Sequence, residues 1–456
     1  MIEGLKPYAE YKESGLPWLD TVPKHWDMAP NRAIMRDQRQ VVGARASDYT
    51  LLSLTLRGVI ARDMVNPKGK FPAQFNTYKV VKPNDFVFCL FDIDETPRGV
   101  GLSPLKGMIT GAYDIFSPTP RINPRFLYHY YLFVDEGKLM KPLYTGLRKT
   151  IQRGVFASLK APLPPPDEQS AIVRFLDHAN RKIDGFVRAK RKLIGLLNEQ
   201  KQAIIHRAVT RGLDPDVPLK DSGIPWLGEI PAHWDVFHSR RLFTVRTELA
   251  RTDDVQLSAT QSYGVIPQAD YEAKIDRRVV KISMHLEKRR HVEKDDFVIS
   301  MRSFQGGIER AWASGAIRSS YVVMKPDPCV DVTFFSYVLK SPGYIRALQA
   351  TGDFIRDGQD LTYGNFRMVD LPLMPLAEQQ QIAKSIESAT NTLNASLTRT
   401  VREIALMQEY RTRLTADIVT GKLDVREAAA KLPADAPLTD EAPDELLDEI
   451  ELEEKG

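Results

Sequence analysis

Two stretches of the sequence repeat each other and decide how the chain is organised. The first reads Tyr11-Lys-Glu-Ser-Gly-Leu-Pro-Trp-Leu-Asp-Thr-Val-Pro-Lys-His-Trp26-Asp27, and the second reads Leu219-Lys-Asp-Ser-Gly-Ile-Pro-Trp-Leu-Gly-Glu-Ile-Pro-Ala-His-Trp234-Asp235. They lie 208 residues apart, and Ser, Gly, Pro, Trp, Leu, Pro, His, Trp and Asp match in register. Chance does not produce such a match, and two copies with a long period indicate duplicated domains rather than a solenoid.

Two further motifs recur with almost the same offset, 210 residues. Ala161-Pro-Leu-Pro-Pro-Pro-Asp-Glu168-Gln169-x-x-Ile172 matches Leu371-Pro-Leu-Met-Pro-Leu-Ala-Glu378-Gln379-x-x-Ile382, and Val209-Thr-Arg-Gly-Leu-Asp214 matches Val419-Thr-Gly-Lys-Leu-Asp424. The segments between the motifs, about 28–160 and 236–370, agree only weakly. Each half of the chain is therefore predicted to have a similar frame around a divergent middle.

Length and composition fit several folded domains. The chain has 456 residues, 43% of them hydrophobic and 27% charged, which is typical of globular proteins. Cys89 and Cys329 form no Cys-x-x-Cys pair, which excludes a disulfide scaffold and suits a reducing cytoplasm. No apolar run is long enough to span a membrane, and residues 1–12 are too polar for a signal peptide.

A long helix is predicted after each Glu-Gln motif. Apolar residues follow alternating steps of four and three, which is the spacing of a stripe buried against a partner helix. In the second helix the steps Leu393–Leu397–Val401 suggest a stutter. We expect the two helices to pack on one another, antiparallel. The predicted seam comprises Ile172, Leu176, Ile183, Phe186, Leu193, Leu197, Ile382, Ile386, Leu393 and Leu397.

The divergent middles are predicted to be mixed helix and strand. Short β-rich runs such as Asp85–Phe91 and Asp296–Met301 are bounded by charge, Gly and Pro. The expected fold class is α+β, with two globular domains and two long helices. The predicted ranges are 1–160 for the first domain, 161–215 for the first helix, 216–370 for the second domain, 371–426 for the second helix, and 427–456 for an acidic tail.

Charge is unevenly distributed along the chain. The formal net charge is +4, but residues 435–456 carry ten acidic residues against Lys455 alone, so the rest of the chain is distinctly basic. A basic body favours polyanions. The tail has few apolar residues, which predicts disorder beyond about residue 430.

Basic groups with polar and aromatic neighbours concentrate in the two middles. Arginine suits guanine edges, glutamine suits adenine, and most lysines contact phosphates. Any single one of these residues is more often a surface or phosphate contact than a base reader. The candidate DNA-binding residues are Arg57, Arg62, Lys68, Lys70, Arg98, Arg148, Lys149, Arg153, Gln261, Tyr263, Arg277, Arg278, Lys288, Arg289, Arg290, Arg302 and Gln305.

Motifs for catalysis within this chain are weak. There is no nucleotide-binding glycine motif, no Asp/Asn-Pro-Pro-aromatic motif of an amino methyltransferase, and the eight histidines have no zinc-ligand spacing. Asp254, Glu272 and Lys274 faintly resemble a nuclease triplet, and Asp92, Asp94 and Glu95 fit a solvated acidic turn better than a metal site. His25 and His233 are expected to cap and pack beside the tryptophans. No catalytic and no metal-binding residues are predicted from the sequence.

The duplicated motif set resembles the specificity subunit of type I restriction-modification systems, over residues 1–426. The resemblance implies a non-catalytic subunit with two target recognition domains, each reading one half of a bipartite, asymmetric site in double-stranded DNA. It also implies a cytoplasmic complex with two methyltransferase and two restriction/translocase subunits, recruited through the long helices. S-adenosylmethionine, ATP and Mg²⁺ would then be bound by partner chains, and this chain would need no cofactor. The acidic tail is not part of the family's motifs.

Two other interpretations remain open at this point. The chain could be a self-sufficient restriction enzyme that uses the Asp254, Glu272 and Lys274 triplet. It could also be a helical scaffold that binds protein rather than DNA.

Overall fold

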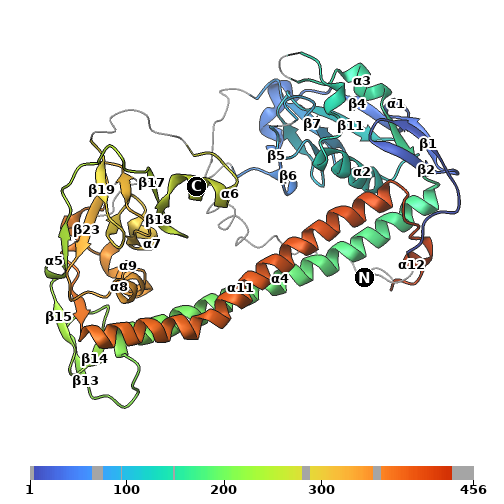
Figure 1. Ribbon diagram of the computed structural model, residues 1–456. Helices are drawn as coiled ribbons and strands as arrows, with labels where there is room; N and C mark the ends of the chain where they lie inside the picture. Colours follow the sequence, from blue (N-terminus) through green and yellow to red (C-terminus); the bar gives the residue numbers. More distant parts are fainter. Residues whose placement is uncertain are drawn as a thin grey trace. The chain divides into compact units, whose positions relative to one another are not determined.

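The computed structural model describes residues 5–63, 75–93, 95–146, 149–279, 288–352 and 361–433. The chain forms two compact units, the first from residues 1–188 and 404–456 and the second from residues 189–403. Two long helices, α4 (Pro166–Arg211) and α11 (Leu376–Val419), each contribute a part to both units (Figure 1). The predicted α+β class with two long helices is confirmed.

The first unit is built around a four-stranded antiparallel sheet with the order β4-β11-β8-β9. The sheet consists of β4 (Met35–Gln38), β11 (Asp114–Pro118), β8 (Phe86–Phe88) and β9 (Val100–Leu102). Four strand pairs accompany it: β1 (Tyr11–Leu16) with β2 (Leu19–Pro23), β3 (Asp27–Pro30) with β12 (Lys160–Leu163), β5 (Leu52–Thr55) with β6 (Gly58–Ala61), and β7 (Lys79–Val81) with β10 (Gly107–Ile109). The helices are α1 (Asn31–Ile34), η1 (Gly43–Asp48), α2 (Pro124–Glu136), η2 (Lys141–Leu143), α3 (Arg153–Ser158) and α12 (Arg426–Ala430).

The second unit has the same arrangement of strands. Its four-stranded sheet, in the order β16-β23-β20-β21, consists of β16 (Phe243–Val245), β23 (Val322–Pro326), β20 (Phe297–Ile299) and β21 (Glu309–Arg310). The pairs are β13 (Leu219–Asp221) with β14 (Glu229–Pro231), β15 (Asp235–Phe237) with β24 (Leu371–Leu373), β17 (Leu257–Thr260) with β18 (Gly264–Pro267), and β19 (Arg290–Val292) with β22 (Gly315–Ile317). The helices are α5 (Ser239–Leu242), α6 (Gln268–Ile275), α7 (Ser303–Gly306), α8 (Val332–Val338), α9 (Pro342–Gln349) and α10 (Tyr363–Phe366).

The strands β8 and β20 come from the two apolar runs singled out in the sequence. All three residues of each strand are buried, because each lies at an interior position of its sheet and is covered on both faces. Phe86 and Phe88 in the first unit pack with Tyr131 of α2 and Phe156 of α3. In the second unit Phe243 packs edge-on against Phe297. Aromatic packing of this kind forms the centre of each core.

The repeated tryptophan of each unit is bonded to the repeated glutamate. Trp26 Nε1 donates to Glu168 Oε1 at 2.9 Å in the first unit, and Trp234 Nε1 donates to Glu378 Oε1 at 2.9 Å in the second. His25 and His233 contact the second oxygen of the same glutamates, at 2.8 and 2.9 Å. A buried indole requires a partner for its N–H, so the His-Trp motif and the Glu-Gln motif depend on each other.

The repeated glutamine anchors the start of each long helix to a neighbouring helix. Gln169 Oε1 accepts from the backbone N–H of Asn123, and Gln379 Oε1 accepts from the backbone N–H of Asp331. Asn123 and Asp331 are the N-cap residues of α2 and α8, whose side chains accept from the first turn of those helices. The same polar frame therefore recurs in both units.

The two long helices pack antiparallel within each unit. In the second unit Lys190 Nζ meets Glu403 Oε2 at 2.7 Å, and Lys201 Nζ donates to Asn394 Oδ1 at 2.8 Å. In the first unit Arg411 pairs with Asp184. The residue numbers fall along α11 as they rise along α4, which is the signature of antiparallel packing.

The residues of the predicted seam differ in burial, and Leu193 in α4 does not fit a buried stripe. Ile172, Leu176, Ile183, Ile382 and Ile386 are buried. Phe186, Leu197, Leu393 and Leu397 are half-buried, whereas Leu193 is 38% exposed. Val187 and Ile194 lie on the packed side in its vicinity. The seam moves by one residue because a helix of 3.6 residues per turn drifts against a strict repeat of 3.5.

The predicted stutter in α11 is also wrong. Val401 is 56% exposed, and Thr400 is buried in its place. Thr390 is buried as well, and both hydroxyls donate to the carbonyl four residues earlier, at 2.8 Å. Because its own helix satisfies the hydroxyl, a threonine can occupy a packed position that an apolar pattern does not reveal.

The acidic tail begins later than the predicted residue 427. Helix α12 packs on the first unit, where Val425 and Ala429 are buried, and Arg174 Nη2 donates to the carbonyl oxygen of Leu432 at 2.7 Å. Val425 and Ala429 pack on core side chains of the first unit. The charge of the segment gave no indication of this packing. Residues 434–456, which carry the acidic run, lie outside the described residues.

Candidate nucleic-acid interface

The hairpin β17–β18 in the second unit presents polar and aromatic side chains at its turn. Thr260 Oγ1 accepts from the backbone N–H of Tyr263 and donates to the carbonyl of Gly264, which closes the turn. Gly264 has a φ of 72°, and a Cβ there would lie 2.7 Å from Nε1 of Trp312. Glycine is therefore required at this position on both backbone and packing grounds. The turn holds Gln261 and Tyr263 at the exposed tip.

A second segment, residues 301–306, lies against this turn. Gln261 Nε2 donates to the carbonyl of Arg302 at 3.2 Å, and a Cβ on Gly306 would lie 2.7 Å from Gln261 Cδ. The side chains of Arg302 and Gln305 are exposed, with Gln305 on the short helix α7. The structure thus brings together Gln261, Tyr263, Arg302 and Gln305, all predicted from the sequence.

Lys340 fixes the hairpin to the body of the unit. Its Nζ donates to the backbone carbonyl of Gln261 at 2.7 Å and pairs with Glu309 Oε2 at 2.8 Å. Glu309 is buried, and burial raises its pKa to about 7, while the Lys340 ammonium acts in the opposite direction. The turn is therefore held also by Lys340, which the buried Glu309 carboxylate anchors, and not by the hairpin hydrogen bonds alone.

Two cation–aromatic pairs flank the turn. Lys274 Nζ lies 5.1 Å from the ring centre of Tyr263, and the Arg310 guanidinium lies 4.5 Å from that of Trp312. Trp312 is 51% exposed, although tryptophan usually is highly buried. Trp312 was not among the residues predicted from the sequence; the only available signal was a tryptophan two residues after Arg310. We call Gln261, Tyr263, Arg302, Gln305 and Trp312 the hairpin surface.

The other predicted residues of the second unit lie elsewhere. Arg277 and Arg278 are exposed just after α6, and Lys288 is exposed before β19. Arg289 is nearly buried, and burial together with the nearby Arg318 lowers its pKa. Arg290 Nη1 donates to the carbonyl of Thr247 at 3.1 Å. The structure therefore gives Arg289 and Arg290 structural contacts, and Arg289 is not a surface residue.

In the first unit, Arg57 occupies the position that corresponds to the hairpin surface. It is exposed in the turn of the hairpin β5–β6, and Arg62 directly follows β6. Three other predicted residues form ion pairs: Arg98 with Glu136 at 3.8 Å, Lys149 with Glu95 at 3.7 Å, and Arg153 with Asp114. Lys68, Lys70 and Arg148 lie outside the described residues.

The three residues of the nuclease-like triplet, Asp254, Glu272 and Lys274, each contact a different partner. Asp254 is hydrogen-bonded to His291 at 2.8 Å, Glu272 Oε1 accepts from the backbone N–H of Val279, and Lys274 lies over Tyr263.

Asp92 has a φ of 45°, and its carbonyl accepts from the backbone N–H groups of Glu95 and Thr96, which makes an acidic turn as predicted. Asp94 lies outside the described residues. Within the ranges that the structure describes, no helix is both long and apolar enough to cross a membrane.

Comparisons with known proteins point to one family. No family model matches the chain. Over 283 residues, 61% of this chain, it is 22% identical to a protein assigned as the MjaX specificity subunit of a type I restriction enzyme in Methanocaldococcus jannaschii. Over 97 residues, 21% of the chain, it is 28% identical to the MjaVIII specificity subunit of the same organism. The matches span 63% and 21% of those relatives, less than two thirds of either.

The fold comparison agrees with the sequence comparison. A chain from a structure of the type I restriction-modification system superposes with a TM-score of 0.59 at 14% identity, over 87% of this chain and 98% of that one. The fold is thus that of a two-unit protein with a pair of long helices. The resemblance predicted from the repeated motifs is confirmed: the chain is similar in sequence to specificity subunits of type I restriction enzymes, and similar in fold to a chain of a type I restriction-modification system.

Proposed function

We propose that this chain is the non-catalytic DNA-reading subunit of a type I restriction-modification complex. Each unit would read one half of a bipartite, asymmetric site in double-stranded DNA. The observation that carries the proposal is the hairpin surface, where a closed turn and the segments packed beside it present exposed arginine, glutamine and aromatic side chains. Rigid presentation of such groups is what base reading in a groove requires.

The two units would read different sequences because corresponding turns carry different residues. The turn of β5–β6 carries Leu56 and Arg57, whereas the turn of β17–β18 carries Gln261 and Tyr263. Arginine and glutamine prefer different base edges. An asymmetric site follows from this difference.

The long helices are proposed to receive the methyltransferase subunits. Leu193, Leu196 and Val401 are exposed on α4 and α11 within the second unit. Solvent-exposed apolar residues that gather on a helix favour a partner surface. Two methyltransferase and two restriction/translocase subunits would complete the complex, and S-adenosylmethionine, ATP and Mg²⁺ would be bound by those chains.

The salt dependence of DNA binding distinguishes this proposal from a protein scaffold. A DNA reader that contacts six or more phosphates should lose about 10³-fold or more in affinity between 50 and 200 mM salt. The measurement is a titration of labelled duplex with the complex of this chain and its methyltransferase. A binding constant that does not change with salt would favour the scaffold.

Insertions in the helices should change the spacing of the two half-sites. Seven residues added after Arg188 in α4, matched by seven after Glu403 in α11, lengthen each helix by about 10 Å. At 3.4 Å per base pair, the unread gap should grow by about 3 base pairs, while both half-sites stay the same. Mapping the modified adenines in cells tests this; an unchanged gap with full modification contradicts the proposed role of the helices.

A further inference from the structure

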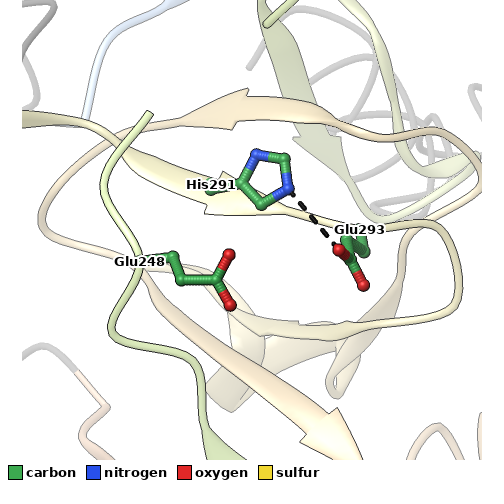
Figure 2. Close-up of side chains that lie close together, drawn as sticks. All are labelled: Glu248, His291 and Glu293. Atoms are coloured by element: carbon green, nitrogen blue, oxygen red, sulfur yellow. Dashed lines mark ion pairs between the residues drawn. The ribbon is translucent and has the colours of Figure 1, made fainter. Parts of the chain in front are cut away.

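A histidine and two glutamates, none of them part of the hairpin surface, converge in the second unit. His291 lies in β19, Glu293 directly follows that strand, and Glu248 lies in the segment before β17. One ligand atom from each of the three residues lies within 4.8 Å of the others (Figure 2). Mixed imidazole and carboxylate ligands are typical of sites for zinc and similar divalent ions.

Backbone hydrogen bonds between the segment 248–250 and β19 bring these side chains together. His291 N–H donates to the carbonyl of Glu248 at 3.0 Å, and Ala250 N–H donates to the carbonyl of Arg289 at 2.9 Å, so the segment 248–250 runs along β19. His291 and Glu293 are two residues apart on an extended chain and therefore point to the same side. Two ligand positions are thus fixed by strand pairing.

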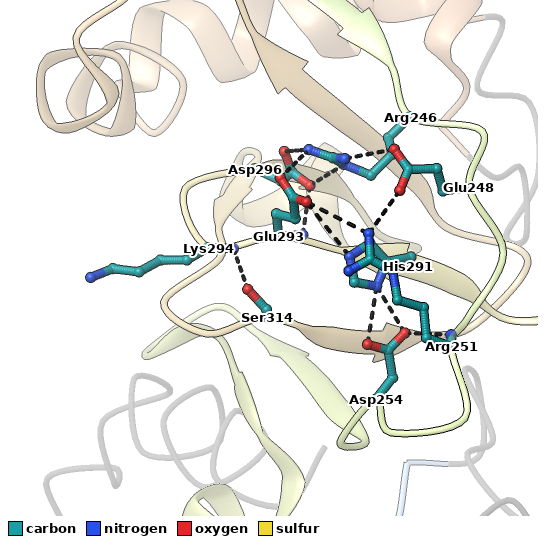
Figure 3. Close-up of polar contacts among 9 residues, drawn as sticks. All are labelled: Arg246, Glu248, Arg251, Asp254, His291, Glu293, Lys294, Asp296 and Ser314. Carbon is teal, nitrogen blue, oxygen red and sulfur yellow. Dashed lines mark hydrogen bonds and ion pairs between the residues drawn. The ribbon is translucent and has the colours of Figure 1, made fainter.

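His291 is prepared for a ligand at one ring nitrogen. Its Nδ1 lies 2.8 Å from Asp254 Oδ2 and 3.0 Å from Oδ1, so Nδ1 is the ring nitrogen that faces this carboxylate and Nε2 is the one left to bind an ion (Figure 3). The side chain is 2% exposed, and among the residues that the structure describes none forms a hydrogen bond with Nε2. The nearest carboxylate oxygen, Glu293 Oε1, is 3.9 Å away, too far for a hydrogen bond. A carboxylate that orients a histidine in this manner is a recurrent feature of metal sites.

Arg246 holds both glutamates in position and leaves one carboxylate oxygen of each available to an ion. Its Nη1 meets Glu248 Oε1 at 2.9 Å and its Nη2 meets Glu293 Oε2 at 3.0 Å, while Nε meets the buried Asp296 at 2.6 Å. The guanidinium therefore uses one oxygen of each glutamate. The second oxygens, Glu248 Oε2 and Glu293 Oε1, remain on the side of His291.

The guanidinium of Arg251 lies beside the two glutamates, where a bound ion would be expected. Arg251 Nη2 lies 3.2 Å from Glu248 Oε2 and 3.8 Å from Glu293 Oε1. Its side chain is about half exposed, so it can leave without disturbing the core. A pocket of about 440 Å³, lined by Arg251, Asp254, His291 and Glu293 among others, connects the group to solvent.

We propose that Glu248, His291 and Glu293 form a site for one divalent transition-metal ion of the zinc class, which displaces the side chain of Arg251. Three protein ligands leave a coordination position for water from the pocket. The ion would fasten the segment 246–254 to β19 within the second unit. This inference does not depend on the proposed DNA-reading function.

The test is a titration of the chelator-treated full-length chain with Zn²⁺ by isothermal calorimetry. We expect one ion per chain, and a loss of at least about tenfold in affinity for the double variant Glu248→Gln, Glu293→Gln. Both side chains are about half exposed, so the variant should fold, which its thermal midpoint without metal verifies. Zn²⁺ should raise the midpoint of the wild type and not that of the variant.

Two further variants make the result specific. Asp253→Asn removes one negative charge beside the same pocket but no ligand, and should leave Zn²⁺ affinity unchanged. Arg251→Gln removes the competing cation and should increase the affinity. If the double variant binds Zn²⁺ as Asp253→Asn does, or if the wild type binds no stoichiometric ion, the proposal is overturned and Arg251 is the permanent partner of the glutamates.

Discussion

Replacing Trp234 by alanine should lower the free energy of unfolding of the second unit by about 3–5 kcal/mol. The indole is fully buried in the core of that unit, and its N–H is the partner of Glu378 at 2.9 Å. Truncation would create a cavity and leave a half-buried carboxylate without its donor, and both effects destabilise. Chemical denaturation of the full chain, followed by hydrogen exchange on peptides of residues 189–403, measures the change.

The control is a tryptophan that the structure places on the surface. Trp312→Ala removes the same side chain from a position that is half exposed, and should cost much less than Trp234→Ala. Trp26→Ala should act on the first unit as Trp234→Ala acts on the second, because Trp26 makes the equivalent bond to Glu168. Equal effects of Trp234→Ala and Trp312→Ala on unfolding would contradict the role given to the repeated motif.

Replacing Arg302 by alanine should weaken binding to the specific site by about 1–3 kcal/mol, the range for a lost contact to a base edge. Its side chain is exposed, whereas the turn is tied through the backbone carbonyl of Arg302, which the substitution preserves. Binding to unrelated duplex should change little, so the loss should appear as reduced discrimination. Fluorescence anisotropy of the assembled complex with specific and unrelated duplexes measures both quantities.

Arg240→Ala is the matched control for this prediction. It removes the same charge from the second unit at an exposed position on α5, apart from the hairpin surface residues. It should lower the affinity for both duplexes only as far as general electrostatics requires. If Arg302→Ala and Arg240→Ala reduce both affinities equally, Arg302 is a phosphate contact and not a base reader.

The frame of the fold could be predicted from sequence because its signals are local or duplicated. The His-Trp and Glu-Gln motifs recur in register, and the structure explains the coupling: Glu168 and Glu378 accept from Trp26 and Trp234. The central strands were visible as short apolar runs. The helix seam was only partly predictable, since Thr390 and Thr400 are buried through hydroxyl bonds to their own helix.

The sites were less predictable because they depend on contacts between distant segments. Gln261 contacts Arg302, 41 residues further along the chain. The residue types could be selected from the sequence, but their contact could not be predicted from it. Arg289 was selected as a basic residue, yet it is nearly buried. The metal-type cluster was invisible for the same reason: Glu248 and His291 become neighbours through pairing across strand β19, not through any ligand spacing.

We propose above that the two units read two separate half-sites of DNA. The most direct measurement is a genome-wide map of modified adenines in cells that express this chain with its methyltransferase partner. We predict a split motif with two short, different halves and a constant unread gap. A continuous motif, or no modification despite a stable complex of the two proteins, would contradict it.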